Sequence, residues 1–201
     1  MTITGNAEFK KIVYNGSDDM AFAYFRNGLA VCDSDSYTYF DTSGGVLVND
    51  QISYGDPVLS PSEKYLMLYD VGGRKYSNQL TGIISRETDG DIIAGDVADD
   101  GSFIITSRSR ETRYVVEMYN ASFTKVMSIY KENYVFDSAI SPDGKLAVIC
   151  SAIPAETDFN CEVEICRRGE ADPVSMKTYE NTMPLDVYTL DDGFVLLCDN
   201  G

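Results

Sequence analysis

A short phrase that recurs along the chain constrains the fold more than any other feature of the sequence. Each copy runs from an aspartate through a short apolar segment and a turn into a second apolar segment, as in DSAISPDGKLAVICS. Copies begin at Asp56, Asp96, Asp137 and Asp186, and a looser copy begins at Asp19. A period of about 40 to 50 residues is typical of propellers and other repeat arrays. We therefore expect an array of similar structural units.

The copy that begins at Asp137 shows how one unit should fold. Residues 141–144, SPDG, predict a turn, because Pro presets φ, Asp can bond nearby backbone and Gly accepts positive φ. Residues 146–150, LAVIC, are apolar throughout, which is typical of a strand buried on both faces. The rest of the copy predicts a loop at residues 153–160, a half-buried strand at 162–165 and a fourth strand at 173–179.

The fold class that follows is all-β, with one β-propeller domain over residues 1–201 built of four-stranded antiparallel blades. No segment keeps a helical apolar spacing over three turns. The last copy stops after its second strand, so we expect an open-arc fragment of a larger ring; the alternative is that residues 9–14, FKKIVY, close a ring of five blades. We expect four full blades and a partial fifth, at residues 19–53, 54–93, 94–133, 134–181 and 182–201.

Composition excludes several classes of function. The chain has no histidine, so it cannot build Ser-His-Asp or Cys-His catalysis or a metal site that uses histidine. Its formal net charge of −16 repels the phosphates of nucleic acid and of anionic lipids. No apolar run reaches the length of about 18 residues that spans a bilayer. We expect no nucleic-acid partner and no contact of this segment with a membrane.

The cysteines indicate packing more than a disulfide framework. Their number, 5, is odd, and their spacing is irregular. Cys32 and Cys198 occupy the same position in their repeats, where another copy has Tyr69, and a position that accepts both residue types favours a core site. Cys150 and Cys161 could become neighbours in a hairpin, so pairing between these two thiols stays open.

The aspartates that lead the repeats are the most suggestive polar set. In a propeller the first strand of each blade lines the central channel, so Asp56, Asp96, Asp137 and Asp186 should form a ring around it. Such a ring could bind Ca²⁺ or another hard cation, which prefers oxygen ligands. The alternative is that each carboxylate accepts backbone N–H groups or ties neighbouring blades together. No catalytic residue and no other cofactor is predicted.

Three segments resemble a known family: AFAYFRNGLAVCDSDSYTYFDTSGGVLVND, DPVLSPSEKYLMLYDVGGRKY and DSAISPDGKLAVIC. They look like a Gram-positive bacterial family of membrane-anchored β-propellers with no assigned function. The phrase SPDGKLAV also resembles the blades of Tol-type and WD-repeat-like propellers, and YFDTSGGVLV those of quinoprotein-type propellers. The resemblance implies an extracytoplasmic propeller anchored by an N-terminal helix, if the chain is part of a longer protein. A chain that truly starts at Met1 would instead be cytoplasmic.

Two functions remain open from the sequence. The first is a non-catalytic binding or scaffold domain of a cell-envelope protein, which binds a protein or cell-envelope ligand through its loop faces. The alternative is the propeller part of a hydrolase, or a cation-binding protein, that uses the channel-facing aspartates. Carboxylate pairs can perform acid–base chemistry without histidine, so a cavity that holds two of them close together would favour the alternative.

Overall fold

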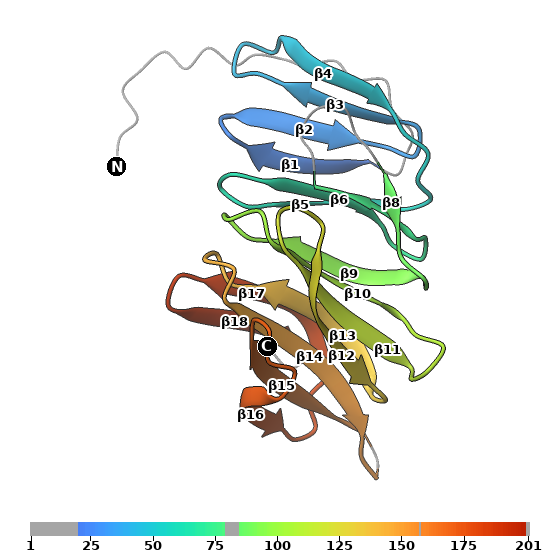
Figure 1. Cartoon of the computed structure of the whole chain (residues 1–201), viewed down its shortest axis with the longest axis vertical. Coiled ribbons are helices and arrows are strands. Elements are labelled where there is room, and N and C mark those ends of the chain that lie inside the picture. The colour runs from blue at the N-terminus through green and yellow to red at the C-terminus, as the bar shows by residue number, and fades with distance from the viewer. Residues whose placement is uncertain (1–19, 79–84, 157, 200–201) are drawn as a thin grey trace.

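The computed structural model describes residues 20–78, 85–156 and 158–199, which form five antiparallel sheets joined in chain order (Figure 1). In every sheet each strand pairs with the next strand along the chain. The strands are β1 (Ala21–Phe25), β2 (Gly28–Cys32), β3 (Ser36–Phe40), β4 (Val46–Gln51), β5 (Pro57–Pro61), β6 (Leu66–Asp70), β7 (Lys75–Ser77), β8 (Arg86–Glu87), β9 (Ile92–Val97), β10 (Phe103–Arg108), β11 (Tyr114–Tyr119), β12 (Lys125–Lys131), β13 (Tyr134–Ile140), β14 (Leu146–Pro154), β15 (Phe159–Arg167), β16 (Pro173–Tyr179), β17 (Pro184–Leu190) and β18 (Gly193–Cys198).

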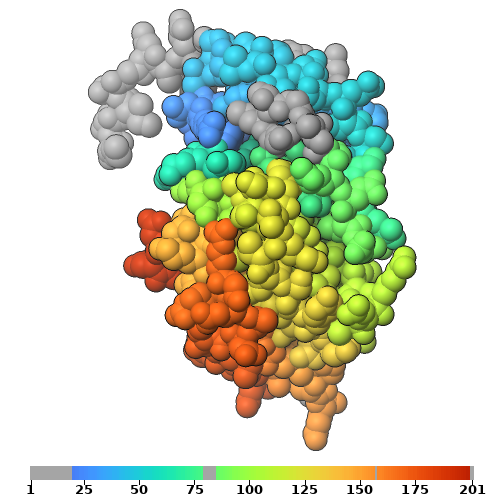
Figure 2. All heavy atoms as spheres, viewed as in Figure 1, coloured from blue at the N-terminus to red at the C-terminus, as the bar shows by residue number. Residues whose placement is uncertain are grey.

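The sheets are arranged as the blades of a propeller. Four sheets have four strands, β1–β4, β5–β8, β9–β12 and β13–β16, and the fifth has the two strands β17 and β18. The first strand of each blade contacts the first strand of the next, from β1 through β5, β9 and β13 to β17. Figure 2 shows the blades as successive bands of colour from the N-terminal to the C-terminal end. The expected all-β fold, an open arc of four blades and a partial fifth, is confirmed.

Apolar side chains fill each space between neighbouring blades. The strand β10 shows the principle: Phe103 and Ile105 pack toward the second blade, and Ile104 packs toward the fourth. Likewise Ala147 and Ile149 of β14 face the third blade, while Val148 and Cys150 face the fifth. Because successive side chains of a strand point to opposite faces, a strand between two blades must be apolar on both. This confirms the prediction made from residues 146–150.

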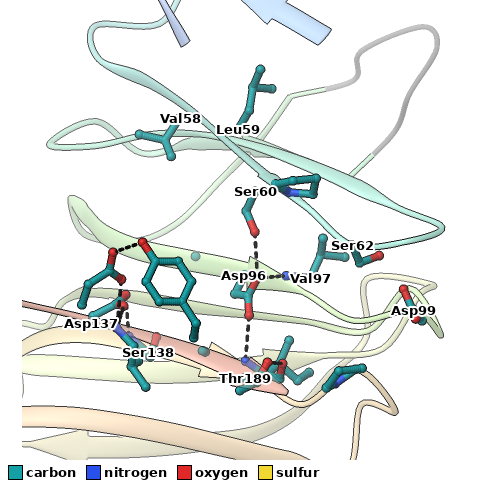
Figure 3. Close-up of a pocket in the computed structure, with 18 of the residues that line it drawn as sticks. Val58, Leu59, Ser60, Ser62, Asp96, Val97, Asp99, Asp137, Ser138 and Thr189 are labelled. Carbon is teal, nitrogen blue, oxygen red and sulfur yellow. Dashed lines mark hydrogen bonds between the residues drawn. The ribbon is translucent and has the colours of Figure 1, made fainter. Parts of the chain in front are cut away.

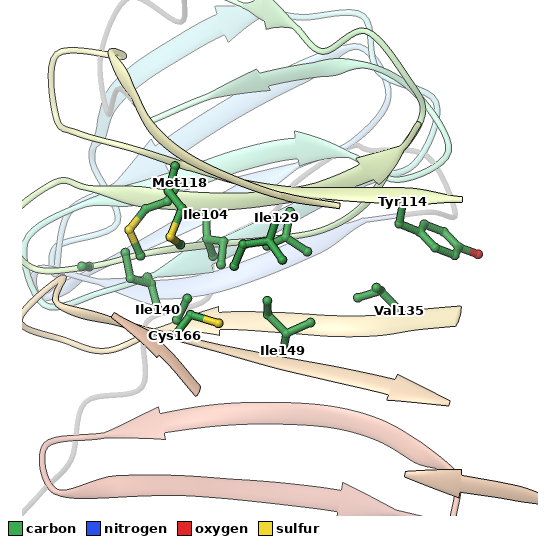
Figure 4. Packing of buried hydrophobic residues seen from close by; sticks show 12 residues of the cluster. Ile104, Tyr114, Met118, Ile129, Val135, Ile140, Ile149 and Cys166 are labelled. Carbon is green, nitrogen blue, oxygen red and sulfur yellow. The ribbon is translucent and has the colours of Figure 1, made fainter. Parts of the chain in front are cut away.

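The interface between the third and fourth blades illustrates these cores (Figure 4). Met118 and Ile104 from the third blade meet Ile140 and Ile149 from the fourth, and Met118, Ile104 and Ile149 have no exposed surface. Burial of apolar area of this kind contributes about 1.5–3 kcal/mol for each large side chain. The cores between blades, and not the single sheets, therefore hold the arc together.

The turns inside the first hairpins follow the sequence expectation. Gly101 and Gly144 have φ of +81° and +71°, which only glycine adopts without strain. The aspartate before each glycine bonds the chain beyond it: Asp100 Oδ1 accepts the Ser102 N–H at 2.8 Å, and Asp143 Oδ1 accepts the Lys145 N–H at 3.1 Å. These Asp-Gly pairs fix the direction in which each hairpin returns.

The fourth blade differs from the expectation in one segment. Residues 153–160 were expected to form a loop, but β14 continues to Pro154 and β15 starts at Phe159, with Ile153 paired to Asn160. The prediction of a long loop was wrong because polar residues at the outer end of a hairpin can still complete a ladder of backbone hydrogen bonds. The first strand of the third blade, β9, begins at Ile92. Residues 9–14 and Asp19 lie outside the described residues.

Candidate functional site

A cavity of about 520 Å³ lies where the first strands of four blades converge (Figure 3). Its walls come from β5, β9, β13 and β17 and from the hairpin turns that follow these strands. Among the described residues that line it, none is Lys or Arg. Its acidic lining residues are Glu63, Asp96, Asp99, Asp137, Asp186 and Asp191.

Asp96 of β9 connects three blades. Its Oδ1 accepts the Ser60 hydroxyl of the second blade at 2.7 Å, and its Oδ2 accepts the Ile140 N–H of the fourth blade at 3.0 Å. The Val97 N–H of its own strand adds a third bond, at 2.9 Å. Burial raises the pKa of the Asp96 carboxyl, and these three donors oppose that rise because they stabilise the charged form.

Asp137 of β13 and Asp186 of β17 form a carboxyl pair on the side of the cavity lined by the fourth and fifth blades. Asp137 Oδ2 accepts the Val187 N–H of the fifth blade at 2.8 Å, and the carboxyl group of Asp186 lies beside it. Burial and the neighbouring Asp186 raise the pKa of Asp137 to about 8. Two adjacent carboxylates repel one another, so the pair keeps one proton near neutral pH.

Two tyrosines flank the carboxyl pair. The Tyr188 hydroxyl donates to Asp186 Oδ2, and this bond raises the pKa of the Tyr188 phenol. Tyr69, on β6, lines the cavity; burial and the nearby Asp137 raise the pKa of its phenol. Sequence reasoning treated Tyr69 only as a core residue and did not single out Ser60 or Tyr188. Tyr188 lies two residues after Asp186, a spacing that places both side chains on one face of a strand and could have been noticed.

Asp56 lies apart from the other three leading aspartates. It is exposed, it precedes β5, and its N–H donates to Asp70 Oδ1 at 2.8 Å. At the position of β5 that faces Asp96, the second blade instead has Ser60. The structure thus brings together Asp96, Asp137 and Asp186 around one cavity and leaves Asp56 outside it.

The deeper carboxylates of the cavity accept hydrogen bonds from the protein itself. Asp96 and Asp137 each accept a backbone N–H from the next blade, as the structural alternative for these aspartates requires. Within the described ranges, no group of three or more Cys, Asp or Glu side chains is placed to hold a metal ion. What the arrangement can do chemically is attract cationic groups to its rim and donate or accept one proton at the Asp137–Asp186 pair.

Comparison with known families gives one match. The family described as "Family of unknown function (DUF5711)" matches residues 5–201. A search of curated proteins finds no match. Across the part of the chain that the structure describes, no helix has both the length and the apolar character of a membrane-spanning segment.

Solved structures with a similar fold are distant in sequence. Hydrazine synthase of Kuenenia stuttgartiensis aligns with a TM-score of 0.66 and 16% identity over 94% of this chain and 59% of that one. Hsv2p of Kluyveromyces lactis gives 0.59 and 12% over 89% and 63%. The Pan2 WD40 domain of Neurospora crassa gives 0.56 and 11% over 88% and 54%. The chain spans about three fifths of the length of these proteins, and the likeness shows the fold alone.

Proposed function

Since the chain belongs to DUF5711, a family of unknown function, and has a propeller fold, we propose that it is a non-catalytic binding domain. Its ligand is a protein with a basic segment, which docks on the loop face around the acidic cavity. The observation that carries this proposal is the convergence of six acidic side chains on one cavity of about 520 Å³ whose described lining contains no basic residue.

The loop face around the cavity is held in place by contacts between neighbouring blades. The Glu63 N–H of the second blade donates to Asp99 Oδ1 of the third at 2.8 Å. The Asp99 N–H in turn donates to the Pro142 carbonyl of the fourth blade at 2.9 Å. Arg168 of the fourth blade pairs with Asp100 at 3.0 Å. A surface ordered before binding loses less entropy when a ligand docks, so these contacts favour a recognition role.

The charge at the cavity mouth selects the class of ligand. Glu63 and Asp191 are exposed at the rim, and Asp99 is half-buried between them and the deeper aspartates. A cleft lined by one sign of charge attracts the opposite charge and speeds its association. The net charge of −16 over the whole chain adds to that field. Lysine or arginine side chains of a partner are the groups that this mouth would admit.

The direct test is binding of a fluorescent oligolysine peptide by the full chain, measured by anisotropy at low and physiological salt. Because exposed charges contribute about 0.2–1 kcal/mol each, the double variant Glu63→Gln, Asp191→Asn should weaken binding by about 2- to 30-fold. Glu111→Gln is the control. It removes one negative charge from an exposed turn between β10 and β11, which does not line the cavity, so it should change binding much less than either rim substitution alone.

Three results would contradict the proposal: no binding of oligolysine, equal binding of an oligoglutamate peptide, or the same loss in the Glu111→Gln control as in the rim variant. A loss of affinity for oligolysine, relative to the wild type, that appears only at low salt and is equal in all variants would indicate attraction by net charge alone. That outcome too would contradict a defined site.

A hydrolase is the second candidate, and one observation favours it. The Asp137–Asp186 pair keeps a proton near neutral pH, as a general acid next to an ionised carboxylate does. Asp137→Asn removes that proton and leaves the rim charges in place. A hydrolase would lose turnover of chromogenic glycosides in this variant, whereas a binding domain would have no turnover to lose and would keep its affinity for oligolysine.

The cellular setting belongs to the proposal as well. The sequence resemblance to membrane-anchored bacterial propellers supports an extracytoplasmic domain of a cell-envelope protein. An acidic loop face suits that setting if the partner is another envelope protein with a basic surface. Fractionation of cells that express the full-length gene, followed by protease accessibility of this domain in intact cells, tests the placement; a protected domain would contradict it.

A further inference from the structure

The interface between the fourth blade and the fifth sheet contains three of the five cysteines. Cys150 of β14 and Cys161 of β15 lie in the apolar cluster of this interface and have no exposed surface. Phe194 and Leu196 of β18 pack against the same cluster. Cys198 follows Leu196 by two residues, so it lies on the same face of β18 and points toward the fourth blade.

Within this interface, Cys161 and Cys198 are near enough to affect each other's ionisation. Each thiol contributes to the shift in the pKa of the other. Cys150 is opposite Val163 in the β14–β15 ladder, and Cys161 is opposite Ala152, so these two cysteines are offset and not directly paired. Cys32 and Cys166 belong to two other clusters. The place of Cys198 on the face of β18 that packs on the cluster of Cys161, together with this mutual effect, selects these two as candidate partners.

We propose that Cys161 and Cys198 form a disulfide that fastens the fifth sheet to the fourth blade when the protein meets a disulfide oxidant. All five cysteines are free thiols in the present structure, which therefore represents the reduced form of the protein. The bond would join β15 to β18 and enclose all of β16 and β17 in a covalent loop.

The chemistry balances with a small-molecule disulfide as the oxidant. Cys198 is partly exposed and reacts first: its thiolate attacks one sulfur of oxidised glutathione, and one glutathione thiolate leaves. Cys161 then loses its proton and attacks the Cys198 sulfur, which expels the second glutathione. The two protein thiols give up two protons and two electrons, and the oxidant is reduced to two glutathione molecules. Burial raises the pKa of the Cys161 thiol to about 11, so the second step should speed up as pH rises.

The test is peptide mapping after treatment of the full chain with oxidised glutathione. Trypsin cleaves after Lys145, Arg167 and Lys177, so Cys198 is released in a different peptide from Cys161. The expected product is a cross-link between the peptides of residues 146–167 and 178–201, with loss of two hydrogen atoms. Because the first peptide also contains Cys150 and Cys166, variants assign the bond. Cys161→Ala and Cys198→Ala should abolish the cross-link, and the matched control Cys150→Ala should retain it.

Thermal unfolding provides a second readout. The disulfide closes a loop of tens of residues, so the oxidised protein should melt about 5–10 °C above the reduced protein, and dithiothreitol should reverse the shift. A stable glutathione adduct on Cys198, a bond inside the peptide of residues 146–167, or unmodified thiols after treatment would each overturn the proposal. If a buried-site variant fails to fold, Cys198→Ala still decides the question, because this residue is partly exposed.

Discussion

Asp137 has a raised pKa because it is buried beside a second carboxyl group of the cavity, that of Asp186. Asp96, Asp186 and the phenols of Tyr69 and Tyr188 surround the same region of the cavity. The repeat in the sequence is enough to select Asp96 and Asp137 as candidate residues. One role considered for them was to tie neighbouring blades together. Their bonds to the N–H groups of Ile140 and Val187 are of that kind. The shared proton could not be predicted, since it depends on how closely two blades approach.

The raised pKa of Asp137 makes stability depend on pH. Between pH 4 and its folded pKa of about 8, the folded protein holds a proton that the unfolded chain releases, so the free energy of unfolding falls as pH rises through this window. Asp137→Asn stays neutral, can still accept the Val187 N–H, and should flatten that slope. We expect it to be more stable than the wild type at pH 8, as measured by urea unfolding at several pH values.

Asp143→Asn is the control for this prediction, because it removes one charge from an exposed turn. Lys145 and Ser141 hold the pKa of Asp143 at about 2, so above roughly pH 5.5 this group is ionised in both the folded and the unfolded state. The control should leave the slope between roughly pH 5.5 and 8 unchanged. If Asp137→Asn also left it unchanged, the shared proton would be wrong.

At the scale of the element, the hairpin was more predictable than the blade. Apolar runs and Asp-Gly turns identify the second strand of a blade, since strands such as β6 and β10 are buried on both faces. The outer strands carry less information because one face is exposed, as in β16, where every residue but Tyr179 is exposed. Glu164 shows the limit: alternation predicted a solvent-facing residue, but it is buried against Lys131 of the third blade.

If the cores between blades stabilise the arc, truncation of an interface residue should be costly. Met118 of β11 has no exposed surface in the interface between the third and fourth blades. Met118→Ala should lower the free energy of unfolding by about 2–5 kcal/mol, measured by urea denaturation. Met176→Ala on β16 is the matched control. Because Met176 is 58% exposed, this substitution should change the free energy of unfolding by less than about 0.5 kcal/mol. Equal effects at both positions would contradict this picture of the core.

At the scale of the molecule, the repeat accounts for the arc, whereas the proposed binding surface depends on where the turns of four blades meet. The second, third, fourth and fifth sheets each contribute at least one acidic residue to the lining of one cavity. Contacts such as the hydrogen bond from the Asp99 N–H to the Pro142 carbonyl hold adjacent turns together. The sequence predicts acidic residues near turns, yet it does not indicate which of them converge, because that depends on the rotation between blades. The loop face as a binding surface is therefore a structural proposal.

Amide hydrogen exchange of the full chain, with and without a bound oligolysine peptide, tests this central claim most directly. The account predicts slower exchange at the turns around the cavity, residues 62–65, 99–102 and 141–145, and little change in the outer strands β4 and β16. Slower exchange confined to those outer strands, or no change anywhere with the peptide bound, would contradict it.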